Sequence, residues 1–83
     1  MSTKEKLINR FKTQPKDFAW DELAGVFKAF GFTVDNKGKT SGSRVLFVKG
    51  EETHAVHKPH PGNILKRYVL RQAYNFLTEK GYL

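Results

Sequence analysis

The sequence predicts an α+β domain in which helices cover one face of a three-stranded antiparallel sheet. Two helical patterns come first, three short strand-like segments follow, and a third helical pattern ends the chain. Glycine- and proline-containing turns separate these segments. With 83 residues and 39% hydrophobic composition, the chain is long enough for one small domain with its own core. We expect residues 1–83 to form that single domain.

The first helix is predicted to begin at Ser2 or Thr3, because either side chain is a favourable N-cap. Pro15 ends it, since proline disfavours helical geometry in the residue before it. Its apolar residues recur on one face: Leu7, Ile8 and Phe11. We expect residues 1–17 to be an N-terminal helical extension of a core that comprises residues 18–83.

The second helix is predicted to start at Asp17 or Asp21 and to end at Gly31, a natural C-terminal cap. Gly25 in its interior costs about 1 kcal/mol relative to alanine, so it indicates a close packing contact. Trp20 at its start is expected to be a packing anchor. The apolar stripe consists of Leu23, Val26, Phe27 and Phe30.

The predicted strands are "FTVD", "RVLFVK" and "THAVHK", with the polar loop "NKGKTSGS" between the first two. Gly50 and Glu51 suit a two-residue type II′ turn between the second and third strands. That turn fixes the register, because each residue pairs with one at equal distance from the turn. The expected cross-strand pairs are Lys49 with Glu52, Val48 with Thr53, Leu46 with Ala55, and Arg44 with His57.

Asn63 is a favourable N-cap for a last helix over residues 64–80, which Gly81 would close. Helical spacing predicts a core-facing stripe that consists of Leu65, Tyr68, Val69, Ala73, Phe76 and Leu77. The phenylalanines of the chain are likewise predicted to form core rather than a surface for stacking bases: Phe27, Phe30, Phe32, Phe47 and Phe76.

Composition narrows the function. The chain has no cysteine, which excludes disulfides and thiolate metal sites. It has no apolar run near the ~18 residues that a membrane span needs, and its first residues are charged where a signal peptide is apolar. These features predict a cytoplasmic protein. The net charge of +7 favours a polyanionic or acidic partner, and a basic but unspecialised surface is the alternative.

Metal and nucleotide-binding motifs are not expected. His54 and His57 would face opposite sides of a strand, and no cysteine or carboxylate stands near His60 to complete a zinc site. The stretch "GKTSGS" resembles the end of a phosphate-binding loop. However, Thr33 stands where that motif requires glycine, and a strand follows where it requires a helix. We therefore predict no metal and no cofactor.

A basic cluster remains as the candidate binding site for an anion. The start of the last helix would add free backbone N–H groups and a partial positive charge beside it. A solvated charged rim is the alternative for the whole cluster, and His60 between two prolines could serve only to shape its loop. The cluster consists of Lys37, Lys39, Arg44, His57, Lys58, His60, Lys66, Arg67 and Arg71.

RNA cleavage is a reaction that two of these side chains could support without a metal. Histidine suits the proton transfers, because its unperturbed pKa is near 6.5. Arginine suits the charged phosphorane, because its guanidinium is permanently charged and can bind two oxygens. If the predicted register is right, His57 and Arg44 are neighbours that supply both kinds of group.

Three stretches resemble one protein family, the HicA-type toxins of bacterial toxin–antitoxin systems. They are "WDELAGVFKAFGF", "GSRVLF" and "HKPHPGNILKRYVLRQ", and the resemblance runs from about Phe18 to Leu77. It implies a fold like a double-stranded-RNA-binding domain, α-β-β-β-α, here with an extra N-terminal helix. It also implies a ribonuclease that cuts messenger RNA without a metal and that a HicB-type antitoxin neutralises.

One position departs from the family pattern. The family's catalytic histidine follows Gly-Ser; here Gly42 and Ser43 match, but Arg44 takes the place of the histidine. Either His57 has taken over proton transfer with Arg44 as its electrostatic partner, or the fold binds RNA through Ser43 and the basic cluster without cleaving it. A third possibility is an interaction domain that binds only an acidic, antitoxin-like protein.

Overall fold

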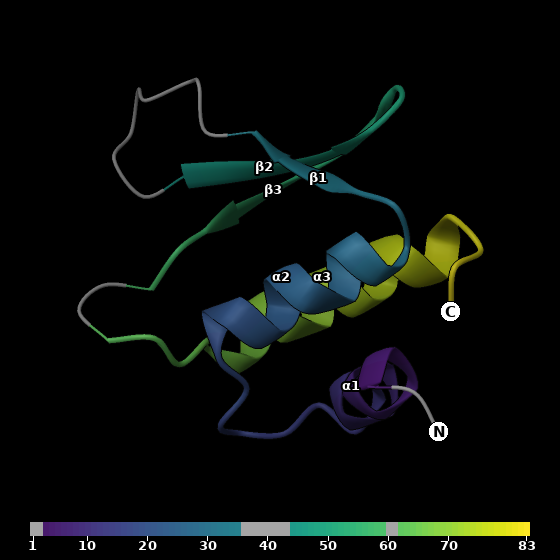
Figure 1. The fold of residues 1–83 in the computed structure, drawn as a ribbon. Helices are drawn as coiled ribbons and strands as arrows, with labels where there is room; N and C mark the ends of the chain where they lie inside the picture. Colours follow the sequence, from purple (N-terminus) through teal and green to yellow (C-terminus); the bar gives the residue numbers. More distant parts are fainter. Residues whose placement is uncertain (1–2, 36–43, 60–61) are drawn as a thin grey trace.

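A computed structural model describes residues 3–35, 44–59 and 62–83 of the chain. The three strands form one antiparallel sheet in the order β1-β2-β3. All three helices lie on the same side of that sheet (Figure 1), which confirms the predicted α+β architecture. The predicted site residues Lys37, Lys39, Ser43 and His60 lie outside the described residues. The elements are α1 (Thr3–Lys12), α2 (Trp20–Ala29), β1 (Thr33–Asp35), β2 (Arg44–Lys49), β3 (Glu52–His57) and α3 (Arg67–Glu79).

The core lies between the sheet and the layer that α2 and α3 form beneath it (Figure 1). The rings of Phe27 from α2 and Phe47 from β2 stack with their centroids 4.3 Å apart. Trp20 is buried against Phe47, as predicted for a packing anchor. The predicted phenylalanine core is confirmed, although Phe30 and Phe76 are only half-buried at its margin.

The β2–β3 hairpin has the predicted register. Lys49 pairs with Glu52 beside the turn, and Arg44 pairs with His57 at the far end. Gly50 has a φ of +62°, the left-handed value that the first turn position of a type II′ turn requires. Since side chains alternate along a strand, this register also fixes which of them face the helices and which face away.

Helix α2 begins at Trp20, between the two predicted starts. Its N-cap is Ala19, and neither Asp17 nor Asp21 caps it. The Glu22 carboxylate accepts a hydrogen bond from the Ala19 N–H at 2.9 Å, so a side chain inside the first turn replaces the missing cap. The other end is as predicted: Gly31 has a φ of +96° after the last helical turn.

Helix α1 packs against the helical layer and not against the sheet (Figure 1). Phe11 is fully buried, with its ring 5.7 Å from that of Phe18 and 6.1 Å from that of Tyr74 in α3. A Cβ atom at Gly25 of α2 would lie 2.7 Å from the Cδ2 atom of Leu7. The predicted close contact at Gly25 is therefore the place where α1 approaches α2.

Helix α3 begins at Arg67, three residues after the predicted start, and Asn63 is not its N-cap. Instead, the Asn63 carbonyl accepts the N–H of Trp20 at 2.8 Å, and the Leu65 N–H donates to the carbonyl of Phe18 at 2.9 Å. This bridge holds the chain extended where the sequence predicted a helix. The prediction failed because the partners of Asn63 and Leu65 are distant in the sequence.

The buried stripe of α3 differs from the predicted one at two positions. Tyr68 was predicted to face the core but is 59% exposed, because at 100° per residue it lies well away from Leu70 and Ala73 on the helix. The buried positions of the helix are Leu70, Ala73 and Leu77. Tyr68 therefore projects from the first turn of α3 toward solvent.

The contact at Gly25 generates a stability prediction. Gly25→Ala should change the free energy of unfolding by less than about 1 kcal/mol, because the gain in helix propensity is offset by movement of the flexible end of Leu7. Gly25→Leu should lower it by about 1–3 kcal/mol, because it must push α1 away. Urea denaturation measures both. Lys28→Leu on the exposed face of α2 is the control, and equal stability of the two leucine variants would contradict the assigned contact.

Candidate functional site

Arg44 and His57 form a pair on the sheet face that no helix covers. They are directly opposite residues of β2 and β3, and both are exposed. Their neighbours Val45 and Val56 are buried, which places the pair itself on the outward face. Directly opposite residues have Cβ atoms about 4.5–5.5 Å apart, so both side chains can reach one phosphodiester group. The predicted adjacency of Arg44 and His57 is confirmed.

His54, three positions before His57 on β3, has a different environment. Its ring faces the core and stacks on Phe76 with centroids 4.6 Å apart. Burial lowers the pKa of His54 below the ordinary histidine value, because desolvation penalises the charged form. His57 is thus the solvent-facing histidine of β3. Within the described ranges, no group of three histidine, aspartate or glutamate side chains could hold a metal ion.

A second part of the site lies on α3. Arg67 and Arg71 are one helical turn apart, and both are exposed. With Gln14, Tyr68 and Leu70 they line a cavity of about 270 Å³. Pockets for drug-sized ligands begin at about 300 Å³, so this cavity suits one base or one phosphate group rather than a larger ligand.

A narrow crevice joins the two parts. Its lining includes His57 from β3 and Tyr68 and Gln72 from α3, and its volume is about 40 Å³. A water molecule occupies about 30 Å³ of liquid, so the crevice admits a water or a hydroxyl group. Tyr68 lines both the crevice and the larger cavity. The two hollows therefore adjoin each other between the edge of β3, residues 54–57, and the start of α3, and we call this surface the α3 groove.

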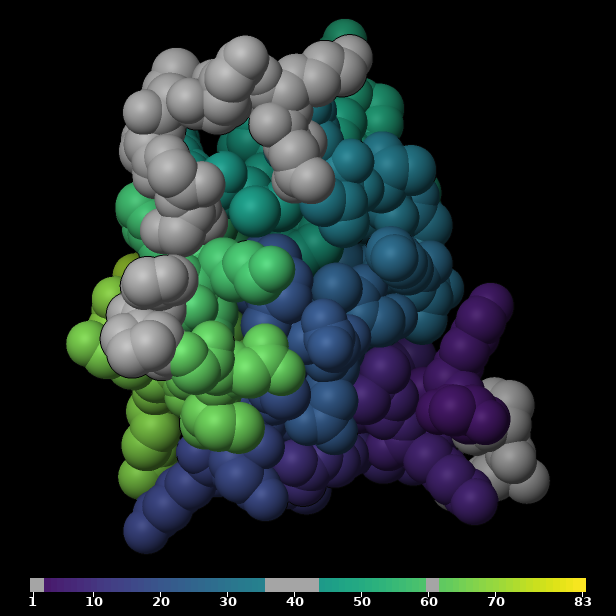
Figure 2. Space-filling model, turned by 60° about the vertical axis from the view of Figure 1, so that its left-hand side comes forward, coloured from purple at the N-terminus to yellow at the C-terminus, as the bar shows by residue number. Residues whose placement is uncertain are grey.

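Charge at the start of α3 makes the α3 groove attractive to anions. Lys66 is the N-cap residue and Arg67 follows it, whereas the first turn holds no acidic side chain. The other two helices carry acidic residues in their first turns, as the helix dipole favours. These cations lie at the positive end of the α3 dipole, so the electrostatic potential there is strongly positive. An anionic ligand bound at this end would be stabilised by that potential. Figure 2 shows this side of the molecule, with the segment between β3 and α3 facing the reader.

The structure divides the predicted basic cluster into two groups. The sheet brings together Arg44 and His57, with exposed Lys58 directly after them. The start of α3 brings together Lys66, Arg67 and Arg71. Sequence reasoning missed Tyr68 and Gln14 as site residues. The signal for Tyr68 was its place between arginines at helical spacing, whereas Gln14 had none, because only the fold brings it to α3.

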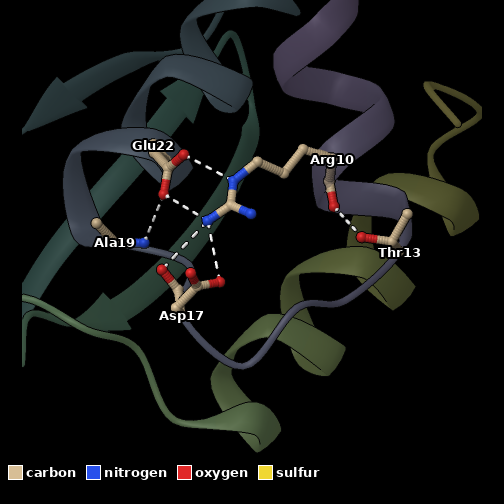
Figure 3. A network of polar contacts seen from close by, with 5 residues as sticks. All are labelled: Arg10, Thr13, Asp17, Ala19 and Glu22. Atoms are coloured by element: carbon tan, nitrogen blue, oxygen red, sulfur yellow. Dashed lines mark hydrogen bonds and ion pairs between the residues drawn. The ribbon is translucent and has the colours of Figure 1, made fainter.

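The connection that carries Gln14 is held by Arg10 of α1 (Figure 3). Arg10 Nε donates to Glu22 Oε2 at 2.9 Å, and its Nη2 donates to Asp17 Oδ1 at 3.1 Å. The guanidinium holds the pKa of Glu22 below its usual value, chiefly through that hydrogen bond. Thr13 Oγ1 donates to the Arg10 carbonyl at 2.6 Å and closes the end of α1. Two ion pairs therefore fix the path of the chain on both sides of Gln14.

Comparison with known proteins adds one match. The model of a family described as HicA toxin of bacterial toxin–antitoxin matches residues 20–77, from the start of α2 to near the end of α3. Searches of curated proteins and of solved structures gave no match. In the described part of the chain, no helix is long and apolar enough to span a membrane.

The environment of His54 generates a pH prediction. Its folded-state pKa lies below the unfolded value near 6.5, so the unfolded chain takes up the proton first as the pH falls. The free energy of unfolding should therefore decrease below about pH 6.5 until the folded-state pKa is reached. His54→Phe keeps a ring against Phe76 and should flatten this dependence in urea denaturation at several pH values.

The control for this experiment is His57→Asn, which changes an exposed histidine of the same strand. It should keep the pH dependence of the parent protein. If His54→Phe retains the full dependence instead, another group is responsible for it.

Proposed function

This chain belongs to the HicA toxin family of bacterial toxin–antitoxin systems, and on that premise we propose that it is a metal-independent RNA endonuclease. Its catalytic pair would be His57 and Arg44. The observation that carries the proposal is their pairing across β2 and β3, with both side chains exposed on the uncovered face of the sheet. We propose that the protein acts in the cytoplasm on messenger RNA.

The chemistry uses the RNA's own 2′-hydroxyl as the nucleophile. The His57 imidazole accepts the proton of that hydroxyl, the O2′–P bond forms, and the P–O5′ bond breaks. The products are a 2′,3′-cyclic phosphate and a 5′-hydroxyl, whose oxygen receives a proton from the imidazolium or from water. The Arg44 guanidinium binds the non-bridging oxygens and stabilises the charge that develops on them. No step requires a metal, because Arg44 supplies the fixed positive charge.

The second candidate function is RNA binding without cleavage. The position that holds the family's catalytic histidine is Arg44, whose permanent charge makes it a poor general base. In the described part of the chain, His57 is the single histidine on the outward face of the sheet. Efficient cleavage uses both a base and an acid, so a lone histidine favours this alternative. The α3 groove would then serve binding alone.

As a toxin of a toxin–antitoxin system, the protein has an antitoxin partner, and we propose that this partner is HicB-like. An antitoxin that covered the basic surface would shield Arg44 and His57 from RNA. The net charge of +7 favours an acidic contact surface on such a partner. If the protein binds its antitoxin but no RNA, the interaction-domain alternative holds.

Cleavage in the presence of EDTA tests the enzyme. The parent protein should cut a mixed RNA and spare DNA of the same sequence, because DNA lacks the 2′-hydroxyl. His57→Ala should reduce the rate by about 10²–10⁴-fold. Arg44→Ala should reduce it as well, and Arg44→His restores the family motif for comparison. Lys28→Ala, an exposed cation on α2, is the control and should cleave like the parent.

The outcomes separate the candidate functions. If His57→Ala cuts RNA as fast as the parent protein, His57 is not the base. A parent that binds RNA without cutting it, while Arg44→His cuts, establishes the non-catalytic alternative.

Salt dependence tests the phosphate contacts independently of cleavage. The double variant Arg67→Ala/Arg71→Ala should reduce the slope of log affinity against log salt by about 1.4, since each phosphate contact to a single strand adds about 0.7. Fluorescence anisotropy of a labelled RNA measures the slope. An unchanged slope would remove both arginines from the RNA-binding surface, and Lys28→Ala again provides the matched control.

A further inference from the structure

Tyr68 is a large aromatic side chain that is exposed to solvent rather than buried in the core. It is 59% exposed in the first turn of α3, and the described part of the chain exposes one other large apolar side chain, Ile64, to a similar degree. Unlike Ile64, Tyr68 lines two hollows, the cavity beside Arg67 and Arg71 and the crevice beside His57. Tyr68 therefore lies between the arginines and the edge of β3 that ends at His57.

Helical spacing gives the α3 groove two parallel rows. Arg67 and Arg71 form one row, and Tyr68 and Gln72 form the next, because residues four apart lie above one another. The arginine row lines the cavity of about 270 Å³, and the Tyr68–Gln72 row lines the crevice beside His57. A strand of RNA that crossed both rows would meet cations, then an aromatic ring, then the edge of β3 at His57.

Gln14 forms the opposite wall of the cavity. It has a φ of +53°, and it is the one non-glycine residue in the described ranges with a positive φ. A left-handed residue of this kind commonly ends a helix, and here it follows the end of α1. Its Nε2 donates to the carbonyl of Phe11 at 3.1 Å, which orients the amide. The second N–H and the Oε1 atom are not used by that bond, and they can pair with the edge of a base.

We propose that the α3 groove binds single-stranded RNA, with one unpaired base in the cavity, stacked on Tyr68 and in contact with Gln14. Arg67 and Arg71 hold the adjacent phosphates, and the next linkage along the strand reaches His57. This inference rests on the proposed function and names its substrate class. Paired bases cannot stack on a tyrosine ring, because a duplex keeps them inside and displays phosphates and 2′-hydroxyls.

The same geometry makes the N-terminal extension part of the binding site. Gln14 lies outside the region that the family model matches, residues 20–77. The ion pairs of Arg10 with Asp17 and Glu22 hold the connection that presents it. Residues 1–17 therefore contribute to RNA recognition in addition to covering the helical layer.

Binding of short labelled RNAs tests the inference in the His57→Ala background, where cleavage does not interfere. Tyr68→Ala should weaken binding of single-stranded RNA by about fivefold or more, while Tyr68→Phe should keep most of the affinity. Gln14→Gly should weaken RNA binding less and should change the preference among homopolymeric RNAs. Glycine suits the positive φ at this position, so the fold is retained. Ile64→Ala, an exposed apolar residue outside both hollows, is the control.

The results distinguish this inference from the proposed function. Equal affinity of Tyr68→Ala and the parent, or preference of the parent for duplex RNA, overturns the inference, while cleavage that depends on His57 would still uphold the enzyme. Weak binding by Tyr68→Ala together with no cleavage by the parent upholds the groove and overturns the enzyme. Circular dichroism of each variant shows whether a loss of affinity reflects a loss of fold.

Discussion

Two backbone hydrogen bonds place the start of α3, and the α3 groove depends on them. They join the segment before α2 to the segment before α3, from the Trp20 N–H to the Asn63 carbonyl and from the Leu65 N–H to the Phe18 carbonyl. The side chains of Phe18 and Leu65 are buried beside this bridge, so water does not compete for its bonds. The bridge holds residues 63–65 extended, so the helix begins at Arg67, with Tyr68 exposed and Leu70 buried in its first turn.

The sheet side of the site depends on a local constraint, the β2–β3 turn. A one-residue slip would bury Arg44 and His57 and expose Val45 and Val56. Burial of an arginine and loss of two valines from the core both cost free energy, so the core opposes the slip. The hairpin and the bridge act at different places. The hairpin turn aligns Arg44 and His57 on the sheet, and the bridge sets the start of α3, with Tyr68, beside the edge of β3.

The sequence was sufficient where the determinants are local. The Gly50–Glu51 turn and the Gly31 cap follow from neighbouring residues, and both were predicted. A close contact at Gly25 was predicted as well, but its partner, Leu7 of another helix, was not. The sequence was insufficient where the local structure depends on a partner far away in the chain. Asn63 is chemically suited to be an N-cap, but its carbonyl accepts the N–H of Trp20 instead. Gln14 reaches α3 only through the packing of α1, so no local pattern could assign it to the site.

Because α3 follows β2 and β3 in the sequence, the order of synthesis bears on when the core of this toxin domain is complete. Arg44 and His57 leave the ribosome before α3 does, but Phe47 and Val56 on the reverse of the same strands need the helical layer to bury them. A nascent chain that stops before Leu70 leaves that apolar surface open and has only part of its core. The sheet residues Arg44 and His57 therefore gain their folded support only once α3 has been synthesised.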